Sequence, residues 1–431
     1  MDVRKASTLL NRDELLEFID ALINEESDSG SHTLCHIDID KFRVVNHGQS
    51  MAAGNELLHE LATLLFSCIN QEDKLAWLYG GSFAIFLKDC AINPARHFIN
   101  RIQDEIKEFR FHWNDEKLAI TVSIGAIQLD SELFVDAAST LMLAEDACRS
   151  VKSRGGNAAE TVAGEVLRTI LEEQRIEANW VAQANLAFEE DRFLLYYQPI
   201  MNLNHDGGEK HYELLIRMLD NNGELVPPGL FLPAAEKYEL GVKIDKWVIE
   251  TATSWIEAYS DLLEDSMCWG INLSGQSLAS VDLHNFVFDQ FERKGIPYES
   301  VYFEITETAV IGSIDNALRF IDTVHKKGGK VALDDFGAGL SSFAYLKTLP
   351  VDYLKIDGLF VKNILEDEFD LSMVKAMKDI ASAMGKQTIA EYVENDEVIA
   401  MLKDLGIDFV QGYGIAKPSS LSRFAEIENL E

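Results

Sequence analysis

The second half of the chain places polar or charged side chains at the ends of eight short apolar segments. The segments read YYQP, YELLIR, INLSG, FEITET, ALDDFG, LKIDG, IAEYVE and VQGYG, and the side chains belong to Gln198, Glu213, Asn272, Glu304, Glu307, Asp334, Asp335, Lys355, Glu391 and Gln411. Ionised carboxylates on apolar strands are costly to bury unless an opposite charge neutralises them. A ring of oxygen ligands around divalent cations explains the pattern economically and indicates an enzyme.

The side chains in this set offer hard oxygen ligands. Carboxylate and amide oxygens are what Mg²⁺ and Mn²⁺ prefer in proteins. The five cysteines and ten histidines are scattered, without CxxC or HExxH spacing, so a zinc site is not expected. The cysteines are odd in number and lie mostly within apolar segments, which favours buried free thiols in a reducing compartment.

Strand and helix patterns alternate from Arg192 to the C-terminus, which predicts a TIM-like (β/α)8 barrel with its chemistry at the carboxyl ends of the strands. Helices are expected near residues 231–239, 243–259, 283–294, 314–327, 370–384 and 396–405. The rival fold, a doubly wound open sheet, normally carries a glycine-rich turn after its first strand. The sequence has no such turn, so the barrel is favoured.

Residues 1–157 alternate helical and strand patterns in another order and predict an α/β domain, a mixed sheet covered by helices. The stretch SRGGNAAETVAGE interrupts the periodicity, so the boundary is placed after residue 157. Residues 158–188 are expected to form a helical linker, and residues 189–431 the barrel domain.

The chain carries a formal net charge of −34 at pH 7. Such a charge repels nucleic-acid polymers and anionic membranes, so a phosphate-bearing substrate is expected to be small and to be met by metal ions. No apolar run reaches the length of a membrane span, and the N-terminus lacks a signal-peptide core. We expect a cytoplasmic location without direct membrane insertion, for a whole protein or for the cytoplasmic part of a larger sensor.

Residues 189–422 resemble the EAL domain, the cyclic di-GMP phosphodiesterase family. The stretches that carry the resemblance are YYQPI, ELLIR, PPGLFLPAAE, NLSGQSL, FEITET, DDFGAGLSSFAYLKTLPVDYLKID, IAEYVE and QGYGIAKP. The resemblance implies two divalent cations, Mg²⁺ or Mn²⁺, which activate water and neutralise charge on the phosphoryl oxygens. The metal ligands that it implies are Glu213, Asn272, Glu304, Asp334, Asp335 and Glu391.

The same resemblance gives roles to further residues. It implies that Lys355 orients or polarises the attacking water, that Glu391 is the general base, and that Glu213 is essential for turnover. The implied substrate-binding residues are Gln198, Leu215, Arg217, Pro233, Asp357, Gln411 and Tyr413. Glu307 would anchor the loop 335–342, whose glycines allow it to close or to couple to a dimer partner. Tyr392 stands where the family has glycine, a change that serves packing or alters access to the pocket.

Residues 1–157 resemble the GGDEF domain, the cyclic di-GMP synthase fold, through HIDIDKFRVVNHGQSMAAGNELL, ITVSIGA and RSVKSRGGN. The signature itself reads Tyr79, Gly80, Gly81, Ser82 and Phe83. Its two acids are replaced by glycine and serine, and a cyclase needs a signature acid together with Asp38 to hold Mg²⁺ on GTP. We therefore expect a degenerate domain without cyclase activity and with at most weak regulatory GTP binding, in which the two glycines form a hairpin turn.

Two functional hypotheses follow. The first is metal-dependent hydrolysis of cyclic di-GMP to linear 5′-pGpG, with the degenerate domain as a regulatory or scaffold module. The alternative is a receptor that binds cyclic di-GMP without hydrolysis and signals by conformational change. Receptors of this kind tend to lose metal ligands, and here each implied ligand position is present. A homodimer through the EAL-like domain is a family expectation.

Overall fold

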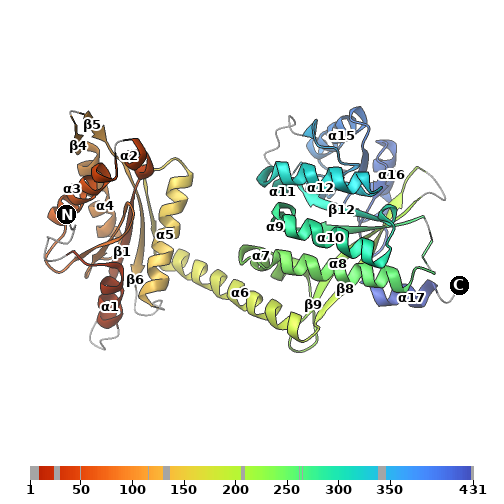
Figure 1. The fold of residues 1–431 in the computed structure, drawn as a ribbon, viewed down its shortest axis with the longest axis horizontal. Helices are drawn as coiled ribbons and strands as arrows, with labels where there is room; N and C mark the ends of the chain where they lie inside the picture. Colours follow the sequence, from red (N-terminus) through yellow and green to blue (C-terminus); the bar gives the residue numbers. More distant parts are fainter. Residues whose placement is uncertain are drawn as a thin grey trace. The chain divides into compact units, whose positions relative to one another are not determined.

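The computed structural model describes residues 9–23, 30–48, 50–114, 116–129, 136–204, 209–261, 263–264, 266–337 and 346–428. The chain divides into two compact units, Met1–Arg175 and Ile176–Glu431 (Figure 1). Among the helices that the structure describes, none combines the length and the apolar character needed to pass through a bilayer.

The first unit is built on a five-stranded sheet in the order β2-β3-β1-β6-β7. The strands are β1 (His32–Ile39), β2 (Lys74–Tyr79), β3 (Ser82–Leu87), β6 (Val122–Leu129) and β7 (Ala159–Val162). Neighbouring strands are antiparallel except β6 and β7, which are parallel. The predicted mixed sheet is confirmed.

Helices cover both faces of this sheet because side chains alternate along the central strand. Cys35, Ile37 and Ile39 of β1 pack with α3 (Met51–Cys68) and α4 (Ile92–Glu108). Leu34 faces the other way and packs with α1 (Arg12–Ile23) and α5 (Ala137–Ser153). The remaining elements of the described part are α2 (Phe42–Gly48), β4 (Arg110–Trp113) and β5 (Glu116–Ala119).

The segment 158–188, predicted to be a helical linker, is a helix only in part. Residues 159–162 form β7, which extends the first sheet, and the helix α6 (Gly164–Glu189) begins after it. A four-residue edge strand of mixed polarity has too little periodicity to be predicted. Leu167 of α6 packs with first-unit residues, whereas Ala184 and Ala187 belong to the core of the second unit.

Eight strands close a barrel in the second unit. They are β8 (Phe193–Asn202), β9 (Lys210–Leu219), β11 (Met267–Leu273), β12 (Val301–Thr306), β13 (Lys330–Phe336), β14 (Tyr353–Ile356), β15 (Gln387–Ala390) and β16 (Phe409–Val410). The strands from β9 to β16 are parallel, and β8 joins β16 to β9 antiparallel to both. The predicted TIM-like barrel is confirmed, with its first strand reversed.

The reversal of β8 corrects one expectation. Gln198 does not lie at the carboxyl end of its strand, as the alignment of eight strand ends predicted, but within β8, opposite Glu213 in the β8–β9 register. Hydrophobic periodicity does not encode strand direction, so the sequence pattern could not show this.

Helices surround the barrel near the positions that the sequence predicts. Those that correspond to predicted helices are α7 (Pro228–Lys237), α8 (Gly241–Ala258), α10 (Val281–Lys294), α12 (Ile314–Lys326), α15 (Glu368–Ala383) and α16 (Asp396–Asp404). The shorter elements are β10 (Leu225–Val226), α9 (Gly275–Ala279), η2 (Tyr298–Ser300), α11 (Glu307–Gly312), α14 (Gly358–Val361), β17 (Ser419–Ser420) and α17 (Leu421–Glu428). Outward-facing strand residues such as Ile271, Phe303 and Leu333 belong to the same core as these helices.

An apolar floor fills the lower interior of the barrel. It consists of Ile200, Cys268, Tyr302, Ala332, Tyr353, Ile389 and Phe409, all of them buried. Side chains two residues apart on a strand point to the same side. Consequently Glu304, Lys355 and Glu391, each two residues beyond a floor residue, lie in the next interior layer towards the carboxyl ends of the strands.

Candidate active site

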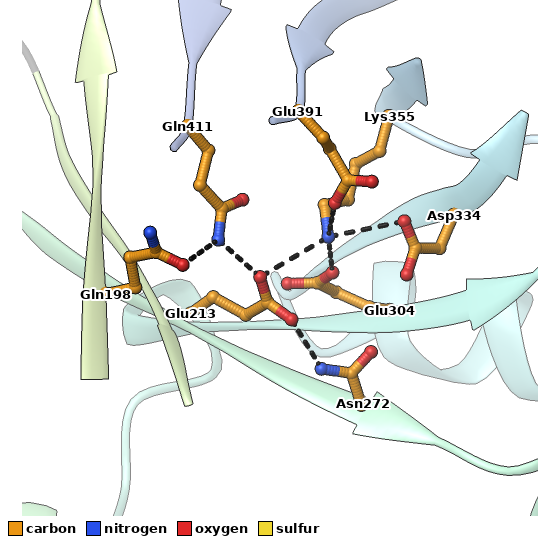
Figure 2. Close-up of polar contacts among 8 residues, drawn as sticks. All are labelled: Gln198, Glu213, Asn272, Glu304, Asp334, Lys355, Glu391 and Gln411. Carbon is orange, nitrogen blue, oxygen red and sulfur yellow. Dashed lines mark hydrogen bonds and ion pairs between the residues drawn. The ribbon is translucent and has the colours of Figure 1, made fainter. Parts of the chain in front are cut away.

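Lys355 lies at the centre of this polar layer, with four carboxylates around it (Figure 2). The side chain is fully buried. Its Nζ lies 2.8 Å from Glu391 Oε1, 3.3 Å from Asp334 Oδ1 and 3.5 Å from Glu213 Oε2. It also forms an ion pair with Glu304. The barrel thus brings together five of the charged residues that the sequence analysis identified on separate strands.

Amide side chains hold Glu213 from the other side (Figure 2). Asn272 Nδ2 donates to Glu213 Oε1 at 2.8 Å, and Gln411 Nε2 donates to Glu213 Oε2 at 2.6 Å. Gln411 Nε2 also donates to Gln198 Oε1 at 3.2 Å, and Gln198 Nε2 donates to the backbone oxygen of Ala416 at 2.9 Å. These bonds fix the orientation of the Glu213 carboxylate.

A glycine makes room for the acidic layer. Gly270 pairs with Glu213 on β9 and with Tyr302 on β12. A Cβ atom on Gly270 would lie 2.4 Å from Glu304 Oε1 and 2.5 Å from the Tyr302 hydroxyl. The absence of a side chain at this position therefore allows Glu304 to approach β11.

The carboxylates of the layer do not share one electrostatic state. Burial opposes ionisation of Glu213, yet Lys355 and the hydrogen bonds from two amides lower the pKa of this carboxyl overall. Burial and the nearby Glu213 raise the pKa of Glu304 well above its ordinary value. Burial raises the pKa of Glu391 to about 8, against the opposing effect of Lys355. One ammonium does not neutralise the cluster, so full ionisation requires further positive charge.

Two observations fit divalent cations at this layer. The buried Oε1 atom of Glu304 has no hydrogen-bond partner among the described residues. One oxygen each from Asp334, Asp335 and Glu391 lie within 4.8 Å of one another, a spacing that allows them to share an ion. Burial, with Asp334 nearby, raises the pKa of Asp335 to about 6. The donors are all oxygens, which suits Mg²⁺ or Mn²⁺.

A cavity of about 400 Å³ opens above the acidic layer. Its lining includes five of the predicted substrate-binding residues, which are Gln198, Leu215, Arg217, Gln411 and Tyr413, together with Glu213 and Glu391. The lining also contains Tyr392, which the sequence analysis singled out as a residue that packs or alters access to the pocket. The sequence analysis missed three further lining positions, Glu394, Gly412 and Pro418, because neither their charge nor their spacing distinguishes them from ordinary loop residues.

Arg217 lies half-buried in this lining. Its Nη1 donates to the backbone oxygen of Ile216 at 2.8 Å, and its guanidinium lies 5.5 Å from the centre of the Tyr196 ring. Burial lowers the pKa of Arg217 from its ordinary value. The stacked, partly desolvated guanidinium is well placed to pair with an anionic group that enters the cavity.

Other predicted site residues lie outside the lining. Pro233 is exposed on α7 and is not among the described residues that line the cavity. Asp357 caps α14, its Oδ1 accepting from the backbone nitrogen of Leu359 at 2.7 Å. Glu307 is buried at the first residue of α11. Most of the predicted loop 335–342 falls outside the described residues, which end at Gly337 on this side.

In the first unit, a lysine side chain pairs with Asp38, the carboxylate that the sequence analysis assigned to Mg²⁺ binding in a cyclase. Lys152 Nζ, at the end of α5, lies 2.7 Å from Asp38 Oδ1. Tyr79 pairs with Ser82 across a turn formed by Gly80 and Gly81, so the predicted hairpin turn is confirmed. Ser82 is buried opposite Asp38. The sequence analysis missed the role of Lys152, because the ion pair joins residues far apart in the chain.

Comparisons with known proteins identify two domains. A model described as "EAL domain" matches residues 181–418, and one described as "Diguanylate cyclase, GGDEF domain" matches residues 5–158. Cyclic di-GMP phosphodiesterase PdeB of Shewanella oneidensis is 33% identical over 418 residues, which cover 97% of this chain and 48% of that protein. The chain thus spans about half the length of this curated relative.

Two solved structures share the barrel. The PaMucR phosphodiesterase in complex with c-di-GMP has a TM-score of 0.54 and 28% sequence identity, with coverage of 57% of this chain and 99% of that one. The FimX EAL domain from Pseudomonas aeruginosa, bound to c-di-GMP, has a TM-score of 0.51 and 30% identity, with coverage of 56% and 96%.

Proposed function

Because the chain belongs to the EAL domain family, we propose that its second unit hydrolyses cyclic di-GMP to linear 5′-pGpG with the help of two divalent cations. The observation that carries the proposal is the buried layer in which Lys355 meets Glu213, Glu304, Asp334 and Glu391. A binding protein without chemistry has no need to bury so many uncompensated carboxylates. The similar proteins PdeB, PaMucR and FimX are described as acting on or binding cyclic di-GMP.

Glu213, Asn272, Glu304, Asp334, Asp335 and Glu391 would hold the cations. When bound, such cations supply Lewis-acid stabilisation of the phosphoryl oxygens and a water of lowered pKa. Glu391, in its ionised form, would accept the proton of the attacking water. Lys355 would orient that water and offset negative charge that develops on the phosphoryl oxygens. Arg217 would pair with the phosphate or with a guanine edge.

The first unit would act as a scaffold or regulatory module. Gly81 and Ser82 offer no carboxylate beside Asp38, and Lys152 already pairs with Asp38. A cytoplasmic location is part of the proposal, supported by the five free cysteines. Weak GTP binding to the first unit and a homodimer through the second unit remain expectations from the family resemblance.

Chromatography of cyclic di-GMP after incubation with the protein and Mg²⁺ or Mn²⁺ tests the proposal. We expect 5′-pGpG to form, and we expect both a chelator and the Glu213→Gln substitution to abolish it. Glu224→Gln, an exposed glutamate on a turn after β9, is the matched control and should hydrolyse like the wild type. Stoichiometric binding of cyclic di-GMP that is recovered intact would instead identify a receptor.

A further inference from the structure

Tyr392 has a backbone conformation that aromatic residues rarely adopt. It follows Glu391 directly after β15, and its φ is +57°. A bulky residue in the left-handed region is strained, and such strain persists only where the surroundings hold it. Glycine would adopt this φ without strain. The chain therefore has an aromatic side chain at a position where the backbone conformation favours glycine.

The ring of Tyr392 is held in place by the backbone of the neighbouring strand-to-helix turn. Gly358 is the first residue of α14, and a Cβ atom added there would lie 2.4 Å from Tyr392 Cδ2 and 2.6 Å from Cγ. One side of the ring thus lies directly on Gly358. The residue is nevertheless 63% exposed, so the ring is supported from one side and open to solvent elsewhere.

Tyr392 is also part of the rim of the cavity above the acidic layer. It lines the same cavity as Glu213, Glu391 and Arg217. Tyr413, another lining residue, is likewise 63% exposed. An isolated exposed aromatic residue needs no explanation. The Tyr392 ring is carried by a strained backbone, rests on Gly358 and lies at the rim of a polar cavity. This arrangement suits a stacking platform for a flat heterocycle.

We infer that Tyr392 is a specificity-determining residue whose ring stacks on one guanine of the cyclic dinucleotide. The inference rests on the proposed function, which supplies a substrate with two purine faces. Stacking through a ring face needs an aromatic side chain but no hydroxyl group. Tyr392 should thus contribute to substrate binding and leave the chemical step to the acidic layer below it.

Steady-state hydrolysis of cyclic di-GMP with Mg²⁺ by three variants tests the inference. Tyr392→Leu should raise KM about tenfold, the loss typical of one stacked base, while kcat stays within about twofold. Tyr392→Phe should keep the KM of the wild type. Tyr238→Leu removes an exposed tyrosine that is not among the described lining residues, and it should change neither constant.

Each result decides between stacking and packing. An unchanged KM in Tyr392→Leu, or an equal rise in KM in Tyr392→Phe, overturns the inference. A lower melting temperature of Tyr392→Leu with wild-type KM assigns the ring to packing on Gly358 and also overturns it. If the wild type binds cyclic di-GMP without hydrolysis, the proposed function fails. The inference is then tested by the same fold-changes between the variants and the wild type, measured in Kd instead of KM. If the wild type neither binds nor hydrolyses cyclic di-GMP, both the proposed function and the inference about Tyr392 are overturned.

Discussion

Lys355 and Glu304 form an ion pair from which solvent is excluded, with 0% and 1% of their surfaces exposed. The pair lies within a layer that holds three further carboxylates around the same ammonium. Removing water from charges is costly unless each charge is compensated. Lys355 therefore supports the structure of the layer as well as the proposed chemistry.

Replacing Lys355 with methionine should affect both turnover and metal-free stability. We expect a loss of about 10²–10³ in kcat, the effect of removing one transition-state donor. Without added metal, the loss of one partner of a buried ion pair should cost about 3–5 kcal/mol. Hydrolysis assays and chemical denaturation measure the two effects. Lys326→Met, which removes an exposed ion pair with Asp322, should change neither. Wild-type values for Lys355→Met in both measurements would contradict the assigned position.

The substitution Gly270→Ala should disturb the acidic layer from the backbone side. The new methyl group would lie 2.4 Å from Glu304 Oε1, so Glu304 or β11 must shift. Overpacking of a core typically costs about 1–3 kcal/mol, and we expect turnover to fall with it. Gly229→Ala on α7 meets no atom within 4 Å and is the matched control. Equal stabilities of the two variants in denaturant would refute the close approach.

Stability should fall in acid because of His211, which packs against the floor of the barrel. His211 is buried between Tyr302, Tyr353 and Phe409, and burial lowers its pKa from 6.5 to about 4. Between about pH 4 and pH 6.5, the unfolded chain therefore binds a proton at His211 that the folded chain does not bind. The free energy of unfolding therefore has its full value above pH 6.5. It falls as the pH decreases towards 4, by an amount on the order of 3 kcal/mol.

Denaturation of metal-free protein at pH 7 and pH 5 measures this effect. His211→Phe keeps an aromatic ring among its neighbours and removes the titrating group, so its stability should depend less on pH. A variant with the same pH dependence as the wild type would assign the acid sensitivity to other groups.

The first unit should leave GTP unchanged. Asp38 pairs with Lys152, and its neighbour on the adjacent strand β3 is the buried Ser82. We expect neither GTP consumption nor cyclic di-GMP formation with Mg²⁺, and Asp38→Asn should behave like the wild type. Formation of cyclic di-GMP that depends on Asp38 would show that the degenerate signature retains synthase activity.

The barrel and the acidic layer could be predicted because both follow from local pattern. The five strands β12 to β16 each carry a buried floor residue that is followed two positions on by a polar residue, such as Lys355 after Tyr353 or Glu391 after Ile389. Two residues with this spacing point to the same side of a strand, so both lie inside the barrel whatever the exact bounds of the strands. The convergence of acids from separate strands therefore required only the correct fold class.

The remaining features depend on relationships between distant residues. The reversal of β8, the pairing of β7 with β6 and the ion pair between Asp38 and Lys152 leave no periodic signal. Pro233 was predicted to line the pocket but lies on an exposed face of α7, whose rotation the sequence does not fix. Gly358 reads as an ordinary turn residue until the Tyr392 ring is seen against it.

The direction of β8 also determines where the chain enters the barrel. The strand begins at Phe193, opposite Met218 near the carboxyl end of β9, soon after α6 ends. With a parallel first strand, that entry point would lie at the far end of the barrel, below the floor. Here a turn at residues 190–191 and then β8 lead from the end of α6 to Gln198, whose side chain contacts the amide that holds Glu213. A displacement at the end of α6 would thus reach the Glu213 carboxylate through one turn, one strand and two side chains.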